Sequence, residues 1–91
     1  MFLAVKTKTG DWSVYIISCN DGSMYTGIST DVERRFEQHK NKKGAKYFYS
    51  HSPEKIVYIE NNHSRSSASQ REYEIKSLTK SNKVKLINEN K

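Results

Sequence analysis

The chain has 91 residues, which is enough for one small domain with a modest hydrophobic core and too few for a second domain. Its 16 lysine and arginine residues outnumber 10 aspartate and glutamate residues, so the net charge is +6, and six aromatic residues are tyrosines. Such a surface suits a polyanion that carries stackable bases, although +6 is also compatible with ordinary solubility. The single cysteine, Cys19, excludes a disulfide within the chain and a thiolate metal cluster.

Residues 1–11 are interpreted as an N-terminal extension and residues 12–91 as the domain. In the extension, Phe2, Leu3 and Val5 could add an edge strand. The apolar start of the chain is too short for a signal peptide, and no segment reaches the length that spans a bilayer. We therefore expect a cytoplasmic protein.

The first predicted element of the domain is a β-hairpin. Residues 14–18 and 24–29 are rich in apolar, aromatic and β-branched side chains, which favour a pleated sheet. Between them, residues 20–22 read Asn-Asp-Gly, a sequence typical of a tight turn. The hairpin therefore turns at these three residues.

The register of this hairpin decides whether its two tyrosines act together. With a two- or four-residue loop, Tyr25 would lie opposite Ser18 and face away from Tyr15. A three-residue loop with Gly22 in the left-handed conformation instead pairs Tyr25 with Ile17. We favour this second register, which places both tyrosine hydroxyls on one face of the sheet.

A helix is predicted to begin at Asp31. Thr30 and Glu33 form a capping box, which satisfies two amide donors that the start of a helix leaves unpaired. Arg35 and His39 follow four residues apart, so they lie on one face, one turn from each other. By itself, such a pair is typical of an ordinary helix surface.

A basic loop, with Gly44 as the expected helix C-cap, leads to three adjacent aromatic residues. Interleaved lysines and aromatics suit a single-stranded or distorted nucleic acid. The expected nucleic-acid-binding residues are Lys42, Lys43, Lys46 and Tyr47. A place in the core is the alternative for Tyr47 and the favoured interpretation for Phe48.

Residues 55–60 are predicted to form a third strand, because they are rich in β-branched side chains. Alternation places Ile56, Tyr58 and Glu60 on one face and Val57 and Ile59 on the other. The strand could be a sheet edge that pairs with another copy, but nothing in the sequence requires this, and a monomer is favoured.

A second helix is predicted near residues 67–79, with Glu72 close to its buried side. Its apolar stripe consists of Ala68, Ile75 and Leu78. Taken alone, Glu72 is typical of a solvated residue that pairs with Lys76 at i+4. Glu74 points elsewhere.

A short final helix is expected near the end of the chain. Ser81 or Asn82 could be its N-cap. Its docking face is expected to consist of Val84, Leu86 and Ile87.

Together these features resemble the GIY-YIG nuclease module. The matching segments are residues 13–15 and 25–27, which correspond to the family's name, and residues 44–47 and 71–76, which are similar to the small stand-alone bacterial members. Ser13 replaces the first glycine of the name. The family's catalytic arginine, ten residues beyond the second tyrosine, corresponds to Arg35, and a histidine that many members carry one turn later corresponds to His39.

The resemblance implies an α+β fold with a small three-stranded antiparallel sheet flanked by helices, in the order β-β-α-β-α with a short C-terminal helix. It implies a metal-dependent endonuclease that hydrolyses phosphodiester bonds, with DNA as the expected substrate and low sequence specificity. Family members place a metal-binding glutamate on the second helix, which corresponds to Glu72, and the expected ion is one Mg²⁺ or Mn²⁺. The implied catalytic residues are Tyr15, Tyr25, Arg35, His39 and Glu72.

In this hypothesis, Tyr15 or Tyr25 helps to deprotonate the attacking water and Arg35 binds the scissile phosphate. His39 relays a proton or contacts a phosphate. A tyrosine with an ordinary pKa of about 10 is a poor base at neutral pH unless nearby cations lower that pKa. Gly27 has no side chain, which would let the helix start or a phosphate approach the strand closely.

One departure from the family pattern supports a second hypothesis. Larger members often carry an asparagine about a dozen residues beyond the glutamate, where this chain has Val84, and Asn82 is close but not aligned. The alternative is a non-catalytic or partner-dependent nucleic-acid-binding module with the same fold. A protein adaptor that uses the aromatic loop is a third possibility, and a protein partner could supply specificity to any of them.

Overall fold

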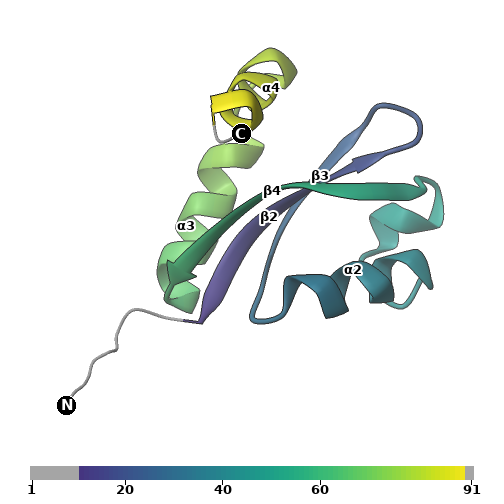
Figure 1. The fold of residues 1–91 in the computed structure, drawn as a ribbon, viewed down its shortest axis with the longest axis horizontal. Helices are drawn as coiled ribbons and strands as arrows, with labels where there is room; N and C mark the ends of the chain where they lie inside the picture. Colours follow the sequence, from purple (N-terminus) through teal and green to yellow (C-terminus); the bar gives the residue numbers. More distant parts are fainter. Residues whose placement is uncertain (1–10, 90–91) are drawn as a thin grey trace.

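The computed structural model describes residues 11–89. Its elements, shown in Figure 1, are β2 (Trp12–Cys19), β3 (Met24–Ser29), α2 (Val32–Lys40), the 3₁₀ helix η1 (Lys46–Tyr49), β4 (Pro53–His63), α3 (Arg65–Lys76) and α4 (Lys80–Glu89). The three strands form an antiparallel sheet in the order β3-β2-β4. The α+β fold is therefore confirmed, whereas the edge strand expected from Phe2, Leu3 and Val5 lies outside the described residues.

The hairpin adopts the favoured register. Tyr25 pairs with Ile17, and Tyr15 pairs with Gly27. Gly22 has φ +86°, the left-handed conformation that the three-residue loop requires. Both tyrosines consequently lie on the same face of the sheet, as predicted.

The third strand is longer than predicted, because its pairing with β2 continues until Trp12 meets His63. A β-bulge also breaks its alternation, since Ile16 pairs with Tyr58 but the next residue of β2 pairs with Ile56. As a result, Val57 and Tyr58 pack on one face of the sheet and Ile56 on the other. The predicted sharing of one face by Ile56 and Tyr58 is wrong.

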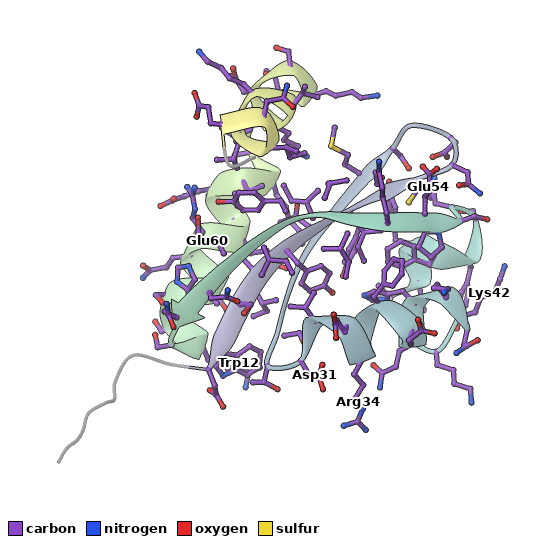
Figure 2. The ribbon with its side chains drawn as sticks, in the orientation of Figure 1. Trp12, Asp31, Arg34, Lys42, Glu54 and Glu60 are labelled. Carbon is purple, nitrogen blue, oxygen red and sulfur yellow. The ribbon has the colours of Figure 1, made fainter. Side chains whose placement is uncertain are left out.

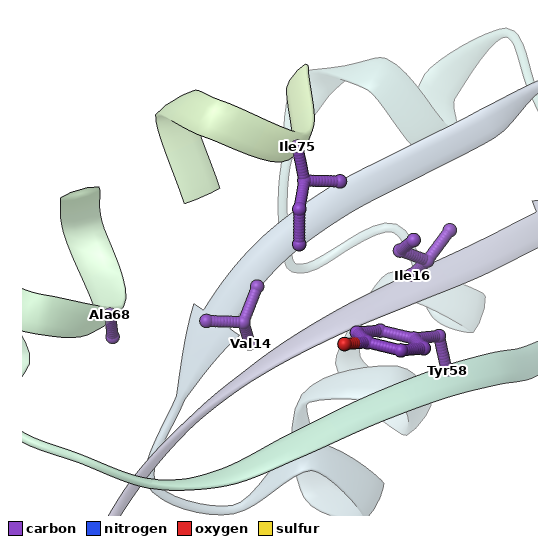
Figure 3. Packing of buried hydrophobic residues seen from close by; sticks show 5 residues of the cluster. All are labelled: Val14, Ile16, Tyr58, Ala68 and Ile75. Carbon is purple, nitrogen blue, oxygen red and sulfur yellow. The ribbon is translucent and has the colours of Figure 1, made fainter. Parts of the chain in front are cut away.

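The sheet separates two hydrophobic clusters, because successive residues of the central strand point to opposite faces. Figure 3 shows the first cluster, in which Val14, Ile16 and Tyr58 pack under Ala68 and Ile75 of α3. The second cluster packs under α2 and η1 and consists of Tyr15, Ile17, Cys19, Val32 and Phe48. Helices α2 and α3 therefore cover opposite faces of the sheet (Figure 1).

The first helix is capped one residue later than predicted. Asp31 is the N-cap of α2, and its carboxylate accepts a hydrogen bond from the Arg34 backbone N–H at 3.1 Å. A carboxylate is a strong cap, and it also complements the positive end of the helix dipole. The predicted capping box of Thr30 and Glu33 is therefore wrong.

The two C-terminal helices begin earlier than predicted. Ser64 caps α3, and its hydroxyl accepts from the Ser67 N–H at 3.0 Å. In α4, the Thr79 hydroxyl accepts from the Asn82 N–H at 3.2 Å, so neither predicted cap is used. Leu86 and Ile87 pack against the first cluster as expected, but the side chain of Val84 is 40% exposed.

Candidate active site

Tyr15 lies in the middle of central strand β2, on the face covered by α2. It is 1% exposed, and its ring crosses over Gly27 on edge strand β3. A Cβ atom on Gly27 would lie 2.6 Å from the Tyr15 hydroxyl oxygen and 2.9 Å from Cε2 of Tyr25. The space that we expected to admit a helix start or a phosphate therefore holds two phenol rings. Gly27 lets the Tyr15 hydroxyl extend over the outer strand.

His39, on α2, fixes the position of this hydroxyl. The ring is fully buried, with Nε2 2.9 Å from Tyr15 Oη and Nδ1 3.3 Å from the backbone nitrogen of Ala45. A backbone N–H can only donate, so Nδ1 is the acceptor, and the neutral ring carries its proton on Nε2. Nε2–H therefore donates to the Tyr15 oxygen, which leaves the phenol proton free to point elsewhere.

Electrostatics keep His39 neutral. Burial, and next the positive charge of Arg35, lower the pKa of His39 from 6.5 to about 4. The imidazole is thus uncharged at pH 7. Its complete burial favours a role in orienting Tyr15 over a direct contact with phosphate.

Gly44 accommodates the His39 ring. A Cβ atom on Gly44 would overlap Nδ1 of this ring and lie 2.7 Å from its Cε1. The predicted C-cap role of Gly44 is wrong, because Asn41 is the C-cap of α2, and its N–H contacts the carbonyls of Glu37 and His39. Two glycines, one on β3 and one in the loop after α2, therefore make room for the Tyr15–His39 pair.

Further aromatic rings extend this cluster toward the surface. The Tyr25 ring centroid lies 5.3 Å from that of His39 and 5.4 Å from that of Tyr47. Tyr47 stacks on His51 with centroids 4.2 Å apart and planes at 14°. Phe48 is 1% exposed, so it belongs to the core as favoured, whereas Tyr47 is only partly buried.

Arg35 brings a fixed positive charge to the cluster. It lies one turn before His39 on α2, and its Nη1 donates to Gln38 Oε1 at 3.0 Å. Its charge acts on the pKa values of Tyr15, Tyr25 and His39. The arginine expected to bind phosphate is therefore within electrostatic reach of all three.

Glu72 approaches the same tyrosines from α3, on the other face of the sheet. Its side chain is 24% exposed, and its negative charge raises the pKa of both Tyr15 and Tyr25. Lys76 Nζ lies 3.3 Å from Glu72 Oε2, which is the ordinary i+4 pair. Glu72 thus forms the expected ion pair and also lies near the aromatic cluster, so the two readings of this residue are compatible.

Both tyrosines are neutral at pH 7. Burial raises the pKa of Tyr15 well above 10, the charge of Tyr25 adds to this shift, and Arg35 opposes it. Burial also raises the pKa of Tyr25, against the positive charges of Lys76 and Arg35. Tyr25 is the more accessible of the two and is flanked by two cations, so its hydroxyl is the better placed to meet water.

The donor set for a metal ion is small. Among residues 11–89, no group of three or more histidine, cysteine, aspartate or glutamate side chains could hold a metal. A single carboxylate that shares the ion with waters and phosphate oxygens is nevertheless typical of Mg²⁺. The Lys76 ammonium already lies against Glu72 Oε2, so a positive charge is accommodated there. The residues present fit one hard divalent cation held jointly with substrate.

The predicted binding lysines lie beside the cluster rather than in it. Lys42, Lys43 and Lys46 are exposed, and they lie in the loop after α2 and at the start of η1. This is the loop that places Gly44 against His39. Their contact with nucleic acid remains a prediction.

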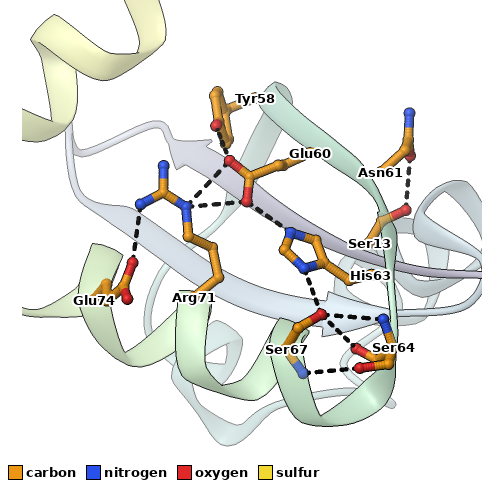
Figure 4. A network of polar contacts seen from close by, with 9 residues as sticks. All are labelled: Ser13, Tyr58, Glu60, Asn61, His63, Ser64, Ser67, Arg71 and Glu74. Atoms are coloured by element: carbon orange, nitrogen blue, oxygen red, sulfur yellow. Dashed lines mark hydrogen bonds and ion pairs between the residues drawn. The ribbon is translucent and has the colours of Figure 1, made fainter. Parts of the chain in front are cut away.

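A second polar cluster, which we did not predict, connects β4 to α3 (Figure 4). Glu60 accepts hydrogen bonds from the Tyr58 hydroxyl at 2.6 Å and from Arg71 Nε at 3.0 and 3.1 Å, and it contacts His63 Nε2 at 2.7 Å. Burial raises the pKa of Glu60, but these partners outweigh burial, so the net pKa is lowered. Alternation along the strand predicted that Tyr58 and Glu60 share one face, and their hydrogen bond confirms it, whereas Arg71 is distant in sequence. The cluster fastens α3, and with it Glu72, to the sheet.

Comparison with known proteins extends these observations. Residues 11–85 match the family described as the GIY-YIG catalytic domain. No helix among residues 11–89 is long and apolar enough to cross a membrane.

Several bacterial proteins are similar over most of their length. The UPF0213 protein SERP0126 of Staphylococcus epidermidis is 50% identical over 76 residues, which cover 84% of this chain and 93% of that protein. The UPF0213 protein SSP2268 of Staphylococcus saprophyticus is 46% identical over the same coverage. The solution NMR structure of the UPF0213 protein BH0048 from Bacillus halodurans is 42% identical, with a TM-score of 0.54 over 85% of this chain and 82% of that one. The names of these relatives state no activity.

Proposed function

Because the chain belongs to the GIY-YIG catalytic domain family, we propose that it is a metal-dependent endonuclease that hydrolyses phosphodiester bonds of nucleic acid, DNA in the first instance. The observation that carries the proposal is the Tyr15–His39 hydrogen bond, placed over Gly27 and within reach of Arg35. Burial of a polar histidine and a phenol lowers the stability of a core relative to apolar side chains, and the pair also requires glycine at positions 27 and 44. A catalytic role would explain why the chain contains this buried pair.

Tyr15 is a hydrogen-bond donor to the substrate in this proposal, and His39 is the residue that positions it. Its oxygen accepts from His39 Nε2–H, so its own proton is available to a phosphate oxygen or to the attacking water at the β3 edge. With a raised pKa, Tyr15 keeps this proton at neutral pH. A neutral donor held in place needs no reorganisation when negative charge develops on the phosphorane.

In this proposal, Tyr25 accepts the proton of the attacking water in its phenolate form, which is the minor form at pH 7 because burial raises its pKa. It is partly exposed, and Lys76 and Arg35 both favour its ionised form. Arg35 binds the scissile phosphate, and its charge balances the negative charge that develops there. Phosphate binding and proton transfer thus fall to neighbouring side chains.

Glu72 would hold the divalent cation, Mg²⁺ or Mn²⁺, together with substrate oxygens and water. When bound, the ion would supply positive charge at the leaving oxygen. The chain itself contributes the Glu72 carboxylate, which is three-quarters buried on α3 and pairs with Lys76 when no divalent cation is bound. Lys42, Lys43, Lys46 and Tyr47 would contact the nucleic acid beside the cut.

The test is a titration of Mg²⁺ and Mn²⁺ against labelled duplex, single-stranded and branched DNA and RNA. Arg35→Ala and Glu72→Gln should each lower kcat by about 100-fold or more while the proteins remain folded and still bind substrate. Arg34→Ala and Glu74→Gln are matched controls on the same two helices and should change kcat less than about twofold. Retained binding with no metal-dependent cleavage of any substrate would instead establish the non-catalytic module.

A further inference from the structure

A hollow of about 360 Å³ adjoins the candidate active site through Arg35. It lies between the start of β2, the end of β3 and the N-terminal turn of α3. The residues that line it are Trp12, Ile28, Ser29, Thr30, Arg35 and Arg65. Its size is within the range of about 300–1,000 Å³ typical of sites for small organic groups.

The lining combines the contacts that a nucleotide requires. Trp12 and Ile28 supply an apolar and aromatic surface, Ser29 and Thr30 supply hydroxyls, and two arginines supply positive charge. Of the described residues that line the hollow, none is acidic. A base or sugar can lie against the indole while the phosphate meets the guanidinium groups.

Arg65 is placed as a phosphate ligand would be. Its guanidinium carbon lies 5.5 Å from the centre of the Trp12 ring, so the charged group and the indole are neighbours in the lining of the hollow. It is also the first residue of α3, where the helix dipole disfavours a cation. An anion bound at this point would be stabilised by both the arginine and the helix end.

Among the residues that the structure describes, a larger hollow on the other side of α2 lacks this combination of aromatic, hydroxyl and cationic side chains. That hollow has about 550 Å³ and is lined by Asp31, Glu33, Arg34, Phe36, Glu37 and Ile56. Three carboxylates against one arginine repel a polyanion. Figure 2 shows Arg34 projecting from α2 away from the sheet, whereas Trp12 lies at the start of β2. Of these two hollows, the smaller one has two arginines and no carboxylate among the described residues of its lining, so its charge favours a polyanion.

We propose that the hollow lined by Trp12, Arg35 and Arg65 is a binding site for one unpaired nucleotide that lies next to the scissile phosphate. Unpaired strands suit it because a base within a duplex cannot reach the indole. This inference rests on the proposed function, since it names the part of the substrate that Arg35 shares with the cut. It makes the substrate a single-stranded or branched nucleic acid.

The test uses Trp12 as its own reporter, because it is the only tryptophan in the chain. Single strands of DNA and RNA of about eight nucleotides, within the range of about 4–16 nucleotides for such sites, are titrated without metal. Binding is followed by anisotropy of the labelled strand and, separately, by Trp12 emission. We expect one or both strands to quench Trp12 at the stoichiometry of binding, and the stronger of the two identifies the sugar. A blunt duplex of the same sequence should bind with little quenching.

Two charge variants separate the hollow from general attraction. Arg65→Glu and Arg34→Glu change the net charge equally, but we expect Arg65→Glu to weaken single-strand binding about tenfold or more beyond Arg34→Glu. Trp12→Phe keeps a smaller ring for packing and should weaken binding a few-fold. Equal effects of the two charge variants, or unchanged Trp12 emission with the strand bound, would overturn the site. Trp12 quenching in a protein that cuts nothing would overturn the proposed endonuclease alone.

Discussion

Gly44→Ala tests whether the buried His39 ring is the reason that position 44 requires a glycine. The new Cβ would overlap His39 Nδ1 and lie 2.7 Å from Cε1, and the ring is fully buried, so it cannot turn out into solvent without breaking its packing. Overpacking of this kind costs about 1–3 kcal/mol of the free energy of unfolding. Alanine also lowers the conformational entropy of the unfolded chain, which stabilises the fold by about 0.4–1 kcal/mol. The net decrease in the free energy of unfolding should therefore be about 1–2 kcal/mol.

The same substitution in a His39→Ala background should be neutral or stabilising by up to about 1 kcal/mol, because the obstructing ring is gone. A double-mutant cycle by urea unfolding should therefore give a coupling energy of about 1–3 kcal/mol between the two positions. The His39→Ala protein is the internal reference, and equal m-values show that the unfolded states are comparable. If Gly44→Ala costs the same in both backgrounds, the ring is not what requires a glycine there.

Tyr25→Phe should lower kcat by at least about 100-fold. Tyr15→Phe should lower both kcat and the free energy of unfolding, the latter by about 1–3 kcal/mol, because it leaves the buried His39 Nε2–H without an acceptor. Kinetics and urea unfolding separate the two effects. The lowered pKa of His39 means that the unfolded chain binds more protons between pH 6.5 and about 4, so stability should fall by about 3 kcal/mol as the pH drops through this window, and His39→Gln should lack that slope in unfolding curves. Glu60→Gln should destabilise the fold by about 2 kcal/mol at pH 7, and thermal scans should show this difference disappearing as acid protonates the wild-type carboxyl through its lowered pKa.

Local chemistry predicted the hairpin well, because alternation and a single turn glycine leave few registers. The three-residue loop with Gly22 followed from these two constraints and is confirmed. Helix starts were less predictable. Thr30, Asp31 and Ser64 are all competent caps by residue type, and the choice among such residues depends on where the preceding strand ends.

The candidate site could be predicted as a set of residues but not as a geometry. The spacing of Arg35 and His39 predicts that they share one helix face, but it does not predict the 2.9 Å contact between His39 and Tyr15. The bulge that sends Ile56 and Tyr58 to opposite faces likewise depends on pairing with a distant strand. A glycine shortly after a helix predicts a C-cap from the sequence alone, whereas the contact of Gly44 with the His39 ring exists only in the folded chain.

The division of the core by the sheet has a consequence for how this domain tolerates change. Cluster residues under α2 and those under α3 share the strands but face away from each other, so substitutions on the two sides should combine additively in stability. Glu72 and Arg35 belong to different sides, each carried by its own helix. Sequence drift could therefore repack either half without disturbing the other, provided that the central strand, and Gly27 opposite it, stay as they are.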